Sequence, residues 1–402
     1  MNKLQKFQEE LKKLNIQEDQ NLKLEEILEF EDFNKENTDY FIYKKIAEGG
    51  SSKVYLARSK NRFVNKIDRV VKLFFKNNDS SSFSKHMAHY EEGNYFARAA
   101  EMQYNLRQLN FIPAFINFGQ LKNEKYYLIE EYIEGKNLSK LSKESLPNFI
   151  EIKQMNSEEY KSKIINKIMK NFCVFDHLIR DLKYLHLWIT VIHRDIKLEN
   201  IIYNEKTRSI HLLDWHIAEK LPYKKKFEDD SINSIDLDNT KIIDDVYGSR
   251  LYTPPEKFLT GESSVKTDMY ALGICMYKFL TGEYPFFNEE VSSNQEISSK
   301  RIKEFMSNKI EYKNILNERI NHLKNLYYTE KAYEKSLTEN INKLIFSKIE
   351  GSFYNEERTI IRQVEYTSHW IKRLLSYELN ERPNFFYFRE GTFSSLFFPE
   401  EL

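Results

Sequence analysis

The spacing of hydrophobic residues begins with an amphipathic pattern near the N-terminus. Within residues 1–38, apolar side chains recur at helical intervals among lysines and glutamates, at Leu4, Phe7, Leu11 and Leu14. Residues three and four apart share one face of a helix, so these side chains form an apolar stripe. We predict a helix here that packs either on the rest of the chain or on a partner protein.

From Tyr40 onward the pattern changes to short runs in which apolar and polar residues alternate, which is typical of strands with one buried face. Glycines or polar clusters separate the runs. Strand-like segments lie at residues 41–48, 53–59, 69–75, around Phe115 and at 127–131. A helical run ending near Leu109 precedes the last two. This part of the chain therefore predicts a small antiparallel sheet with one main helix.

After Leu138 the helical period dominates, and we predict a mostly helical C-terminal half. Helical spacing is clearest at residues 164–188, 264–281 and 298–346. No run reaches the roughly 18 uncharged apolar residues that a membrane-spanning helix needs. We therefore predict no membrane span.

Composition narrows the choice of compartment and partners. The 402 residues are 41% hydrophobic, which allows a large core and excludes disorder as the main state. The 61 basic and 61 acidic side chains cancel, so no global field attracts nucleic acid or an anionic membrane. Cys173 and Cys275 are too few for a disulfide framework or a structural zinc site. We predict a reducing, cytoplasmic location, which would be a host cytoplasm if the chain is a microbial effector.

The strongest chemical signal is the segment His-Arg-Asp-Ile-Lys-Leu-Glu-Asn from His193 to Asn200, with Asp214 on the next hydrophobic run. A lone His-Arg-Asp is more often a structural turn. Phosphoryl transfer, however, needs a positioned hydroxyl, metal ions on phosphate oxygens and neutralised charge. Asp195 would accept the proton of a substrate hydroxyl, and Lys197 would contact the transferred phosphate. Asn200 and Asp214 would supply oxygen ligands to Mg²⁺.

In order and spacing, this segment resembles the catalytic loop of the eukaryotic-type serine/threonine protein kinases. The resemblance implies an α+β, bilobal protein-kinase-like fold, with a small antiparallel-sheet N-lobe carrying one main helix and a larger, mostly helical C-lobe. It predicts an N-terminal helical extension at 1–39, the N-lobe at 40–131 and the C-lobe at 132–402, with a helical insertion at about 288–366. It also implies ATP as the donor and Mg²⁺ as the metal, with Mn²⁺ as an alternative.

A glycine-containing loop lies upstream, at residues 46–54, between two predicted strands. In the resembled family such a loop covers the phosphates of ATP, but only Gly49 keeps a family glycine position. Ala47 and Ser52 occupy the other two and hinder backbone approach. Lys72, on the next predicted strand, matches the family lysine that anchors the phosphates. Read alone, it is a lysine on a surface strand.

The resemblance also assigns the residues around the nucleotide. Backbone groups of Glu131 and Ile133, at the end of the last N-lobe strand, would meet the adenine. Val54, Val70 and Ile202 would sandwich the ring, although each one read singly is more often plain core. The full set of nucleotide-binding candidates is Ala47, Gly49, Gly50, Val54, Val70, Lys72, Glu131, Ile133 and Ile202.

The family lysine takes a glutamate of the main helix as counter-ion. We predict Glu101 as the catalytic partner of Lys72. Asn105 stands four residues later, however, where the family has an apolar residue. Glu92, followed four residues on by Phe96, is the alternative.

The resemblance puts Glu130 at the position called the gatekeeper, on the strand that leads to the adenine site. A carboxylate there must be hydrogen-bonded, paired or in contact with water, because an isolated buried charge is costly. We therefore expect Glu130 to have a partner.

The segment from Gly248 to Glu256 resembles the end of a kinase activation segment. In the family, Glu256 would pair with the later Arg382, and Asp268 would hold the catalytic-loop backbone. Kinases of small molecules normally lack this segment end and its arginine, so a protein substrate is implied. Lys197 and Ser249 resemble serine/threonine rather than tyrosine kinases.

The clearest departure from the family is Asp-Trp-His in place of Asp-Phe-Gly, with His216 at the glycine position. A histidine lacks the backbone freedom of glycine, so reduced activity, or a pseudokinase, is the first rival interpretation. Retention of Lys72, Asp195, Asn200 and Asp214 favours an active enzyme.

Two further hypotheses concern regulation and partners. A phosphate on the long segment after Asp214 would pair with Arg194 and order that segment. The candidate positions are Ser231, Ser234, Thr240 and Tyr247. Alternatively, the chain acts mainly as a binding scaffold, through a partner protein at the N-terminal helix or at the C-lobe insertion.

Overall fold

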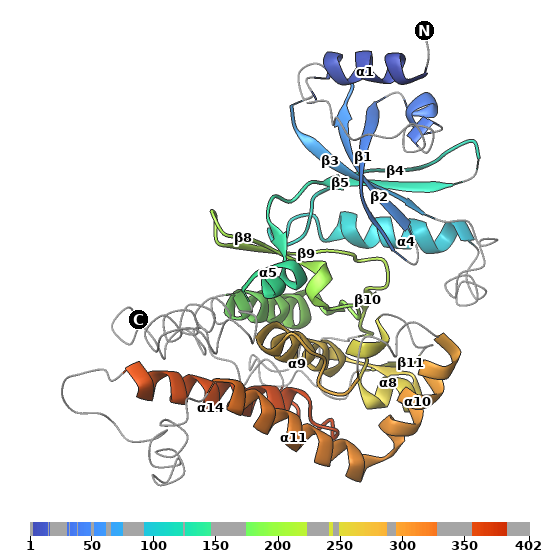
Figure 1. Ribbon diagram of the computed structural model, residues 1–402. Helices are drawn as coiled ribbons and strands as arrows, with labels where there is room; N and C mark the ends of the chain where they lie inside the picture. The colour runs from blue at the N-terminus through green and yellow to red at the C-terminus, as the bar shows by residue number, and fades with distance from the viewer. Residues whose placement is uncertain are drawn as a thin grey trace, which may run out of the picture. The chain divides into compact units, whose positions relative to one another are not determined.

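The alternating runs form an antiparallel sheet in the first of two units of the chain (Figure 1). The sheet unit comprises Met1–Glu134 and His211–His216, and the helical unit comprises Gly135–Ile210 and Ile217–Leu402. The computed structural model describes residues 3–14, 16, 30–31, 33–37, 39–49, 52–61, 66–74, 92–123, 125–145, 174–222, 241–243, 249–287, 295–327 and 356–383.

The sheet has the strand order β1-β2-β3-β5-β4. Its strands are β1 (Tyr40–Glu48), β2 (Ser52–Ser59), β3 (Asp68–Phe74), β4 (Phe115–Gln120) and β5 (Tyr126–Glu131). All neighbouring strands are antiparallel, which confirms the predicted sheet.

The register of three central strands decides which side chains share a face. Lys72 on β3 lies opposite Val54 on β2, and Val70 lies opposite Glu130 on β5. Directly opposed residues point to the same face of a sheet, and so do residues two apart on one strand. Val54, Val70, Lys72 and Glu130 therefore lie on one face. Val71 and its cross-strand partners, Tyr55 and Ile129, lie on the other.

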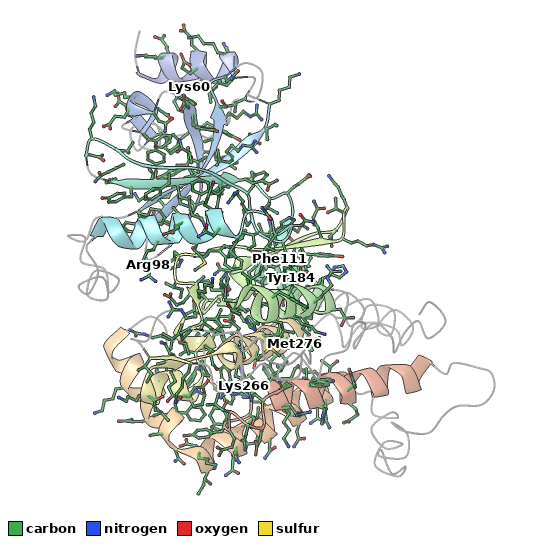
Figure 2. All side chains as sticks on the ribbon, turned by 180° about the vertical axis from the view of Figure 1, so that it is seen from behind. Lys60, Arg98, Phe111, Tyr184, Lys266 and Met276 are labelled. Carbon is green, nitrogen blue, oxygen red and sulfur yellow. The ribbon has the colours of Figure 1, made fainter. Side chains whose placement is uncertain are left out.

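The N-terminal segment covers the face of the sheet that carries Val71. Helix α1 (Lys3–Lys13) packs into a core of buried residues that includes Phe7, Leu11, Leu14, Phe30, Phe33, Tyr55, Val71 and Ile129. Arg58 Nη1 donates to the carbonyl of Leu14 (3.2 Å). Lys60, which is labelled in Figure 2, donates from Nζ to the carbonyl of Asn37 (2.6 Å). The helix therefore packs on the chain's own sheet, which is the first of the two predicted locations.

Helix α4 (Glu92–Asn105) covers the opposite face, the one that carries Lys72. Phe96 stacks on Phe74 of β3, with ring centroids 4.3 Å apart. Phe96, Ala99, Ala100, Gln103 and Leu106 are buried, at the spacing of one helical stripe. Gln103 is the single polar residue of this stripe.

The helical unit is organised around α9 (Val265–Thr281), all of whose residues are buried. Ser264 caps its N-terminus, accepting a hydrogen bond from the amide of Lys266, and Gly282 ends it in the left-handed conformation at φ 82°. These signals explain why the predicted helix at 264–281 is confirmed nearly to the residue. Gly273 permits close packing, because a Cβ there would lie 2.8 Å from Cβ of Leu374.

The other helices of the unit include α5 (Leu138–Ser145), α8 (Pro255–Thr260), α10 (Gln295–Ser307), α11 (Lys309–Tyr327) and α14 (Glu356–Leu374). Residues 174–184 are also helical and run into a π-helical turn, Leu185–Ile189. Single 3-10 turns lie at Leu198–Asn200 and Arg250–Tyr252.

The remaining strands are short. They are β6 (Lys136–Asn137), β7 (Val191–Ile192), β8 (Ile201–Asn204), β9 (Ser209–Leu212), β10 (Glu219–Lys220), β11 (Ile242–Ile243) and β12 (Glu262–Ser263). They form the sheets β6-β8-β9, β10-β7 and β11-β12.

Helix α11 lies within the predicted insertion at 288–366, and it packs into the core of the unit. Tyr312 is fully buried, and its hydroxyl donates to the carbonyl of Leu375 (2.8 Å). Residues 288–294 and 328–355 lie outside the described residues, so the extent of an insertion stays a prediction. Among the described residues, no helix combines the length and apolarity that crossing a membrane requires.

Candidate functional site

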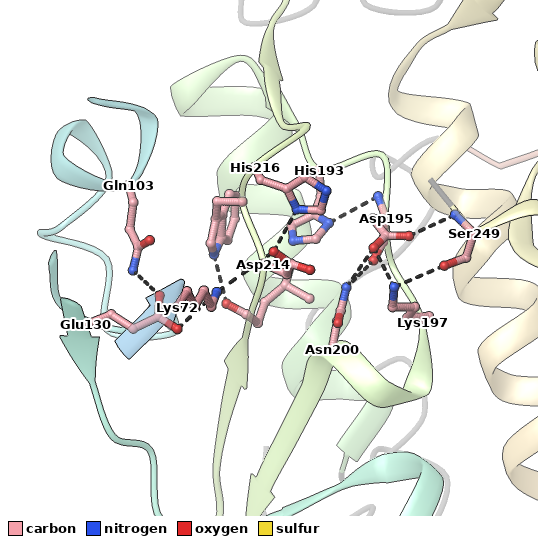
Figure 3. A network of polar contacts seen from close by, with 12 residues as sticks. Lys72, Gln103, Glu130, His193, Asp195, Lys197, Asn200, Asp214, His216 and Ser249 are labelled. Carbon is pink, nitrogen blue, oxygen red and sulfur yellow. Dashed lines mark hydrogen bonds and ion pairs between the residues drawn. The ribbon is translucent and has the colours of Figure 1, made fainter. Parts of the chain in front are cut away.

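Lys72 lies at the centre of a buried ionic cluster in the sheet unit (Figure 3). Its Nζ is 3.0 Å from Oε1 of Glu130 and 3.8 Å from Oδ1 of Asp214. The side chain of Lys72 is 10% exposed and that of Glu130 is 4% exposed. The gatekeeper carboxylate therefore has the partner that its burial demanded.

The same cluster keeps Lys72 charged. Burial by itself would lower the pKa of the ammonium, but the carboxylates of Glu130 and then Asp214 raise it above its ordinary value. A permanently charged lysine suits the binding of phosphate oxygens.

The predicted helix partner of Lys72 is wrong. Glu101 lies on the exposed side of α4, whereas Lys72 pairs with Glu130 of β5. Two residues along a helix correspond to about 200° of rotation, so Glu101 and the buried Gln103 face opposite ways. Glu92 begins α4, and its side chain lies outside the described ones.

Asp214 and His216 form a close contact in the segment that follows β9. His216 Nδ1 lies 2.6 Å from Asp214 Oδ1, the oxygen that also faces Lys72. Asp214 has a φ of 69°, a left-handed conformation that non-glycine residues seldom adopt. Trp215 is buried and donates from Nε1 to the carbonyl of Leu212 (2.8 Å), which ties down this turn.

The glycine loop is described at Ala47 and Gly49, which are both exposed, and Gly50 lies outside the described residues. The amide of Gly49 donates to the carbonyl of Ser52 (2.9 Å), which links the residue after β1 to the start of β2. By register, Ala47 lies opposite Val54 and so shares the face of Lys72.

At the end of β5, the backbone of Glu131 is partly committed to the fold. Its amide donates to the carbonyl of Ala114 (2.9 Å), and its Oε2 accepts from the amide of Ala114 (3.1 Å). Both bonds tie the end of β5 to the segment before β4. Ile133 follows and is buried.

The catalytic-loop motif forms a second polar cluster, in the helical unit. Asp195, 3% exposed, accepts at Oδ2 from Lys197 Nζ (2.7 Å) and Asn200 Nδ2 (3.0 Å). Its Oδ1 accepts from the amide of Ser249 (3.0 Å), while Lys197 Nζ also donates to Ser249 Oγ (3.0 Å). The carboxylate is thus fixed from two sides.

Asn200 sits in the 3-10 turn after Lys197, and its amide nitrogen makes both contacts to Asp195. Its amide oxygen is consequently turned away from Asp195, as a neutral oxygen donor for a hard cation.

Asp268 of α9 holds the catalytic loop from beneath. Its Oδ2 accepts from the amide of His193 and its Oδ1 from the amide of Arg194, both at 2.8 Å. His186 Nε2 lies 2.7 Å from the same Oδ2. These bonds hold Arg194 at a φ of 67°, a strained conformation for a non-glycine residue.

Glu256 and Arg382 form the predicted ion pair. Nη1 of Arg382 donates to Oε1 of Glu256 (2.7 Å) and Nη2 to Oε2 (2.9 Å). The arginine side chain is fully buried, and its Nε donates to the carbonyl of Ser376 (2.7 Å). The predicted pairing is confirmed, and it is bidentate.

The profile of the protein kinase domain matches residues 40–390, most of the chain. The chain belongs to the protein kinase family. A probable serine/threonine-protein kinase of Dictyostelium discoideum is 26% identical over 375 residues, covering 83% of this chain and 71% of that protein. Serine/threonine-protein kinase PknD of Chlamydia trachomatis serovar D is 28% identical over 256 residues, 61% of this chain and 25% of that protein. Serine/threonine-protein kinase D of a Synechocystis strain is 27% identical over 259 residues, which cover 64% of this chain and 43% of that protein.

This kinase therefore spans 71% of the Dictyostelium protein but less than half of either bacterial relative. Family membership confirms the predicted fold class and enzyme class. It agrees with the two clusters, each of which contains residues that the family pattern assigns to phosphoryl transfer.

Sequence reasoning missed Gln103 and Glu219 of this kinase. Gln103 was detectable as a lone polar residue on the apolar stripe of α4, four residues after Ala99. Glu219 lies on β10, with Oε2 3.7 Å from Nη2 of Arg194. The sequence around Glu219 does not indicate its pairing with Arg194, because that pairing depends on β10 lying beside β7.

Proposed function

We propose that this kinase transfers the γ-phosphoryl group of ATP to serine and threonine hydroxyls of proteins, with Mg²⁺, or Mn²⁺ in its place. The observation that carries the proposal is the carboxylate of Asp195, held by Lys197, Asn200 and the amide of Ser249. A fixed, buried carboxylate is suited to accept a proton from a substrate hydroxyl. The hydrogen bond from Lys197 to Ser249 supports a serine/threonine kinase.

We infer that Lys72 and Asp214 act on the same nucleotide as Asp195 and Asn200. Lys72 would bind phosphate oxygens, while Asp214 and Asn200 offer the hard oxygen ligands that Mg²⁺ prefers. The bound metal would neutralise the charge of the phosphates. The chain's own part is to orient the donor, hold the hydroxyl and receive its proton.

The adenine of ATP would bind at the end of β5, against one face of the sheet. The carbonyl of Glu131 and the backbone of Ile133 would bind the base edge, and Val54 and Val70 would cover one side of the ring. Ile202 of β8, which is partly buried, would cover the other.

Regulation by phosphorylation is the third part of the proposal. Ser231, Ser234, Thr240 and Tyr247 lie outside the described residues. Arg194, the proposed phosphate ligand, donates from Nε to the carbonyl of Ile217 (2.6 Å) and faces Glu219 at 3.7 Å. Because Glu219 already neutralises part of this charge, we expect a phosphate to raise activity only modestly.

We propose a reducing, cytoplasmic compartment for this kinase, because its two cysteines are too few for a disulfide framework. Cys275 is a free, buried cysteine, and burial raises the pKa of its thiol well above the ordinary value, so it is an unreactive thiol. A partner protein at α1 would have to use its polar side, because Phe7, Leu11 and Leu14 are buried in the sheet unit.

The test is phosphate transfer from labelled ATP with Mg²⁺ to a mixed protein substrate, followed by mapping of the modified residues. We expect phosphoserine and phosphothreonine, and losses of about 100-fold or more in Asp195→Asn and Lys72→Met. Lys44→Met, at an exposed position of β1, is the matched lysine control and should retain activity. Unchanged transfer by Asp195→Asn, or phosphotyrosine alone, would contradict the assignment.

One observation favours a second candidate, a pseudokinase that acts as a scaffold. His216 Nδ1 bonds to Oδ1 of Asp214 and so competes with a metal for that oxygen. In this case ATP would raise the melting temperature without any transfer, and His216→Gly, which frees that oxygen for a metal, should restore transfer. An active enzyme would instead show transfer that depends on Asp214.

A further inference from the structure

We propose that Glu130 of β5 is the counter-ion that positions Lys72 and that Gln103 of α4 holds Glu130 in place, so that a neutral amide replaces the helix carboxylate. The inference rests on the proposed function, since it takes Lys72 as the residue that binds the phosphates. It extends that function by two positioning residues.

The register of the sheet brings Glu130 to Lys72. Val70 lies opposite Glu130, and Lys72 is two residues beyond Val70 on the same face. The two side chains are therefore diagonal neighbours, a separation that a long lysine spans. The result is a contact of 3.0 Å between side chains that are 10% and 4% exposed. With so little solvent nearby, the pair is strong and leaves Lys72 little freedom.

Gln103 completes the coordination of the carboxylate. Its Nε2 donates to Oε2 of Glu130 (2.8 Å) and to the carbonyl of Pro113 (3.0 Å). Gln103 is 1% exposed. Each oxygen of Glu130 therefore has its own partner, Lys72 on Oε1 and Gln103 on Oε2 (Figure 3).

The charge balance explains why this helix position carries an amide. Lys72 already faces two carboxylates, those of Glu130 and Asp214. A glutamate in place of Gln103 would bring a third negative charge within hydrogen-bonding distance of Glu130. Like charges in a buried site oppose ionisation, and Lys72 would gain nothing from a second strong partner. A glutamine donates to Glu130 without adding charge.

In this arrangement the position of the Lys72 side chain is fixed by a carboxylate of the sheet instead of a carboxylate of the helix. In this chain the ion pair joins β3 to β5, two strands paired along their length. Helix α4 contributes only the amide contact and the stacking of Phe96 on Phe74. A shift of α4 would thus loosen Glu130 but leave its bond to Lys72 in place.

An exchange of the two side chains tests the proposal. In the full chain, Glu130→Gln removes the counter-ion, Gln103→Glu adds a carboxylate, and the double variant restores one carboxylate and one amide. We expect each single variant to raise the KM for ATP about tenfold, with the KM for the protein substrate unchanged, and the exchange to recover to within about threefold of the parent. Loss of folded enzyme alone would lower kcat and leave both KM values unchanged.

Glu101→Gln is the matched control on α4, and its KM for ATP should equal that of the parent. Melting curves identify any single variant that does not fold, and the exchange variant then carries the comparison. A parental KM for ATP in Glu130→Gln, an exchange no better than the worse single variant, or a raised KM in Glu101→Gln would each overturn the inference.

Lys72→Met separates this inference from the proposed function. If Lys72→Met keeps full transfer, the role of Lys72 itself fails. If Lys72→Met loses transfer while Glu130→Gln keeps the parental KM, only the assignment of the counter-ion fails.

Discussion

Removing the guanidinium of Arg382 should destabilise the helical unit strongly. Arg382 is fully buried and makes two short bonds to Glu256, whose side chain is 10% exposed. Arg382→Met keeps the apolar stem but leaves a carboxylate without its partner in a site that is nearly dry. Breaking one side of a buried pair costs about 3–5 kcal/mol.

Other contacts of Arg382 add to this loss. The guanidinium also bonds to the carbonyl of Ser376 and lies 4.9 Å from the ring centroid of Tyr270. For a unit of this size, 1 kcal/mol corresponds to about 2–4 °C in melting temperature. We therefore expect Arg382→Met to melt roughly 10 °C below the parent, as measured by thermal unfolding monitored by circular dichroism.

Two further variants make the test specific. Arg382→Met combined with Glu256→Leu removes both charges, and it should melt higher than Arg382→Met alone because no charge remains unpaired. Lys136→Met breaks an exposed pair with Glu144, whose side chains are 44% and 41% exposed, and should shift melting by less than about 2 °C. A shift that small in Arg382→Met would show that the buried pair contributes no more than a surface pair.

Three other outcomes follow from the geometry of the helical unit. Glu219→Gln removes the carboxylate beside Arg194, so the fall in activity after phosphatase treatment should become larger than in the parent. Burial raises the pKa of Asp181 to about 6, so its ionisation destabilises the fold progressively from about pH 4 upward and fully above about pH 6. Asp181→Asn should therefore raise the melting temperature at pH 7.5 and have no effect below about pH 4. Gly273→Ala would place a Cβ 2.8 Å from Leu374, and a loss of about 1–3 kcal/mol in urea unfolding is expected; a neutral result would mean that α14 moves freely away.

Much of the catalytic cluster was determined by sequence alone. Asp195, Lys197 and Asn200 lie within six positions, and one 3-10 turn is enough to bring the amide of Asn200 onto the carboxylate of Asp195. Helix α9 was equally predictable, since Ser264 and Gly282 mark its ends with local capping chemistry. In both cases the decisive interactions connect residues close together in the chain.

The environment of Lys72 was decided by the tertiary structure. The sequence offered Glu101 and Glu92 as partners, because helical spacing shows which residues share a face but not which face meets a sheet. The rotation of α4 turned Gln103 inward, and the pairing of β3 with β5 brought Glu130 within 3.0 Å of Lys72.

The same distinction separates the predicted pair of Arg382 with Glu256 from two features that only the tertiary structure decided. The pair of Arg382 with Glu256 follows a pattern of the whole family, so the resemblance predicted it although the two residues are 126 positions apart. The contact of Arg194 with Glu219 depends on β10 pairing with β7, and the cover of α1 on the sheet depends on which apolar surfaces remain to be buried. Ion pairs and hydrophobic contacts form between residues that are neighbours in space. The sequence reveals such neighbours only where they are close in the chain or where the pairing is known from the resembled family.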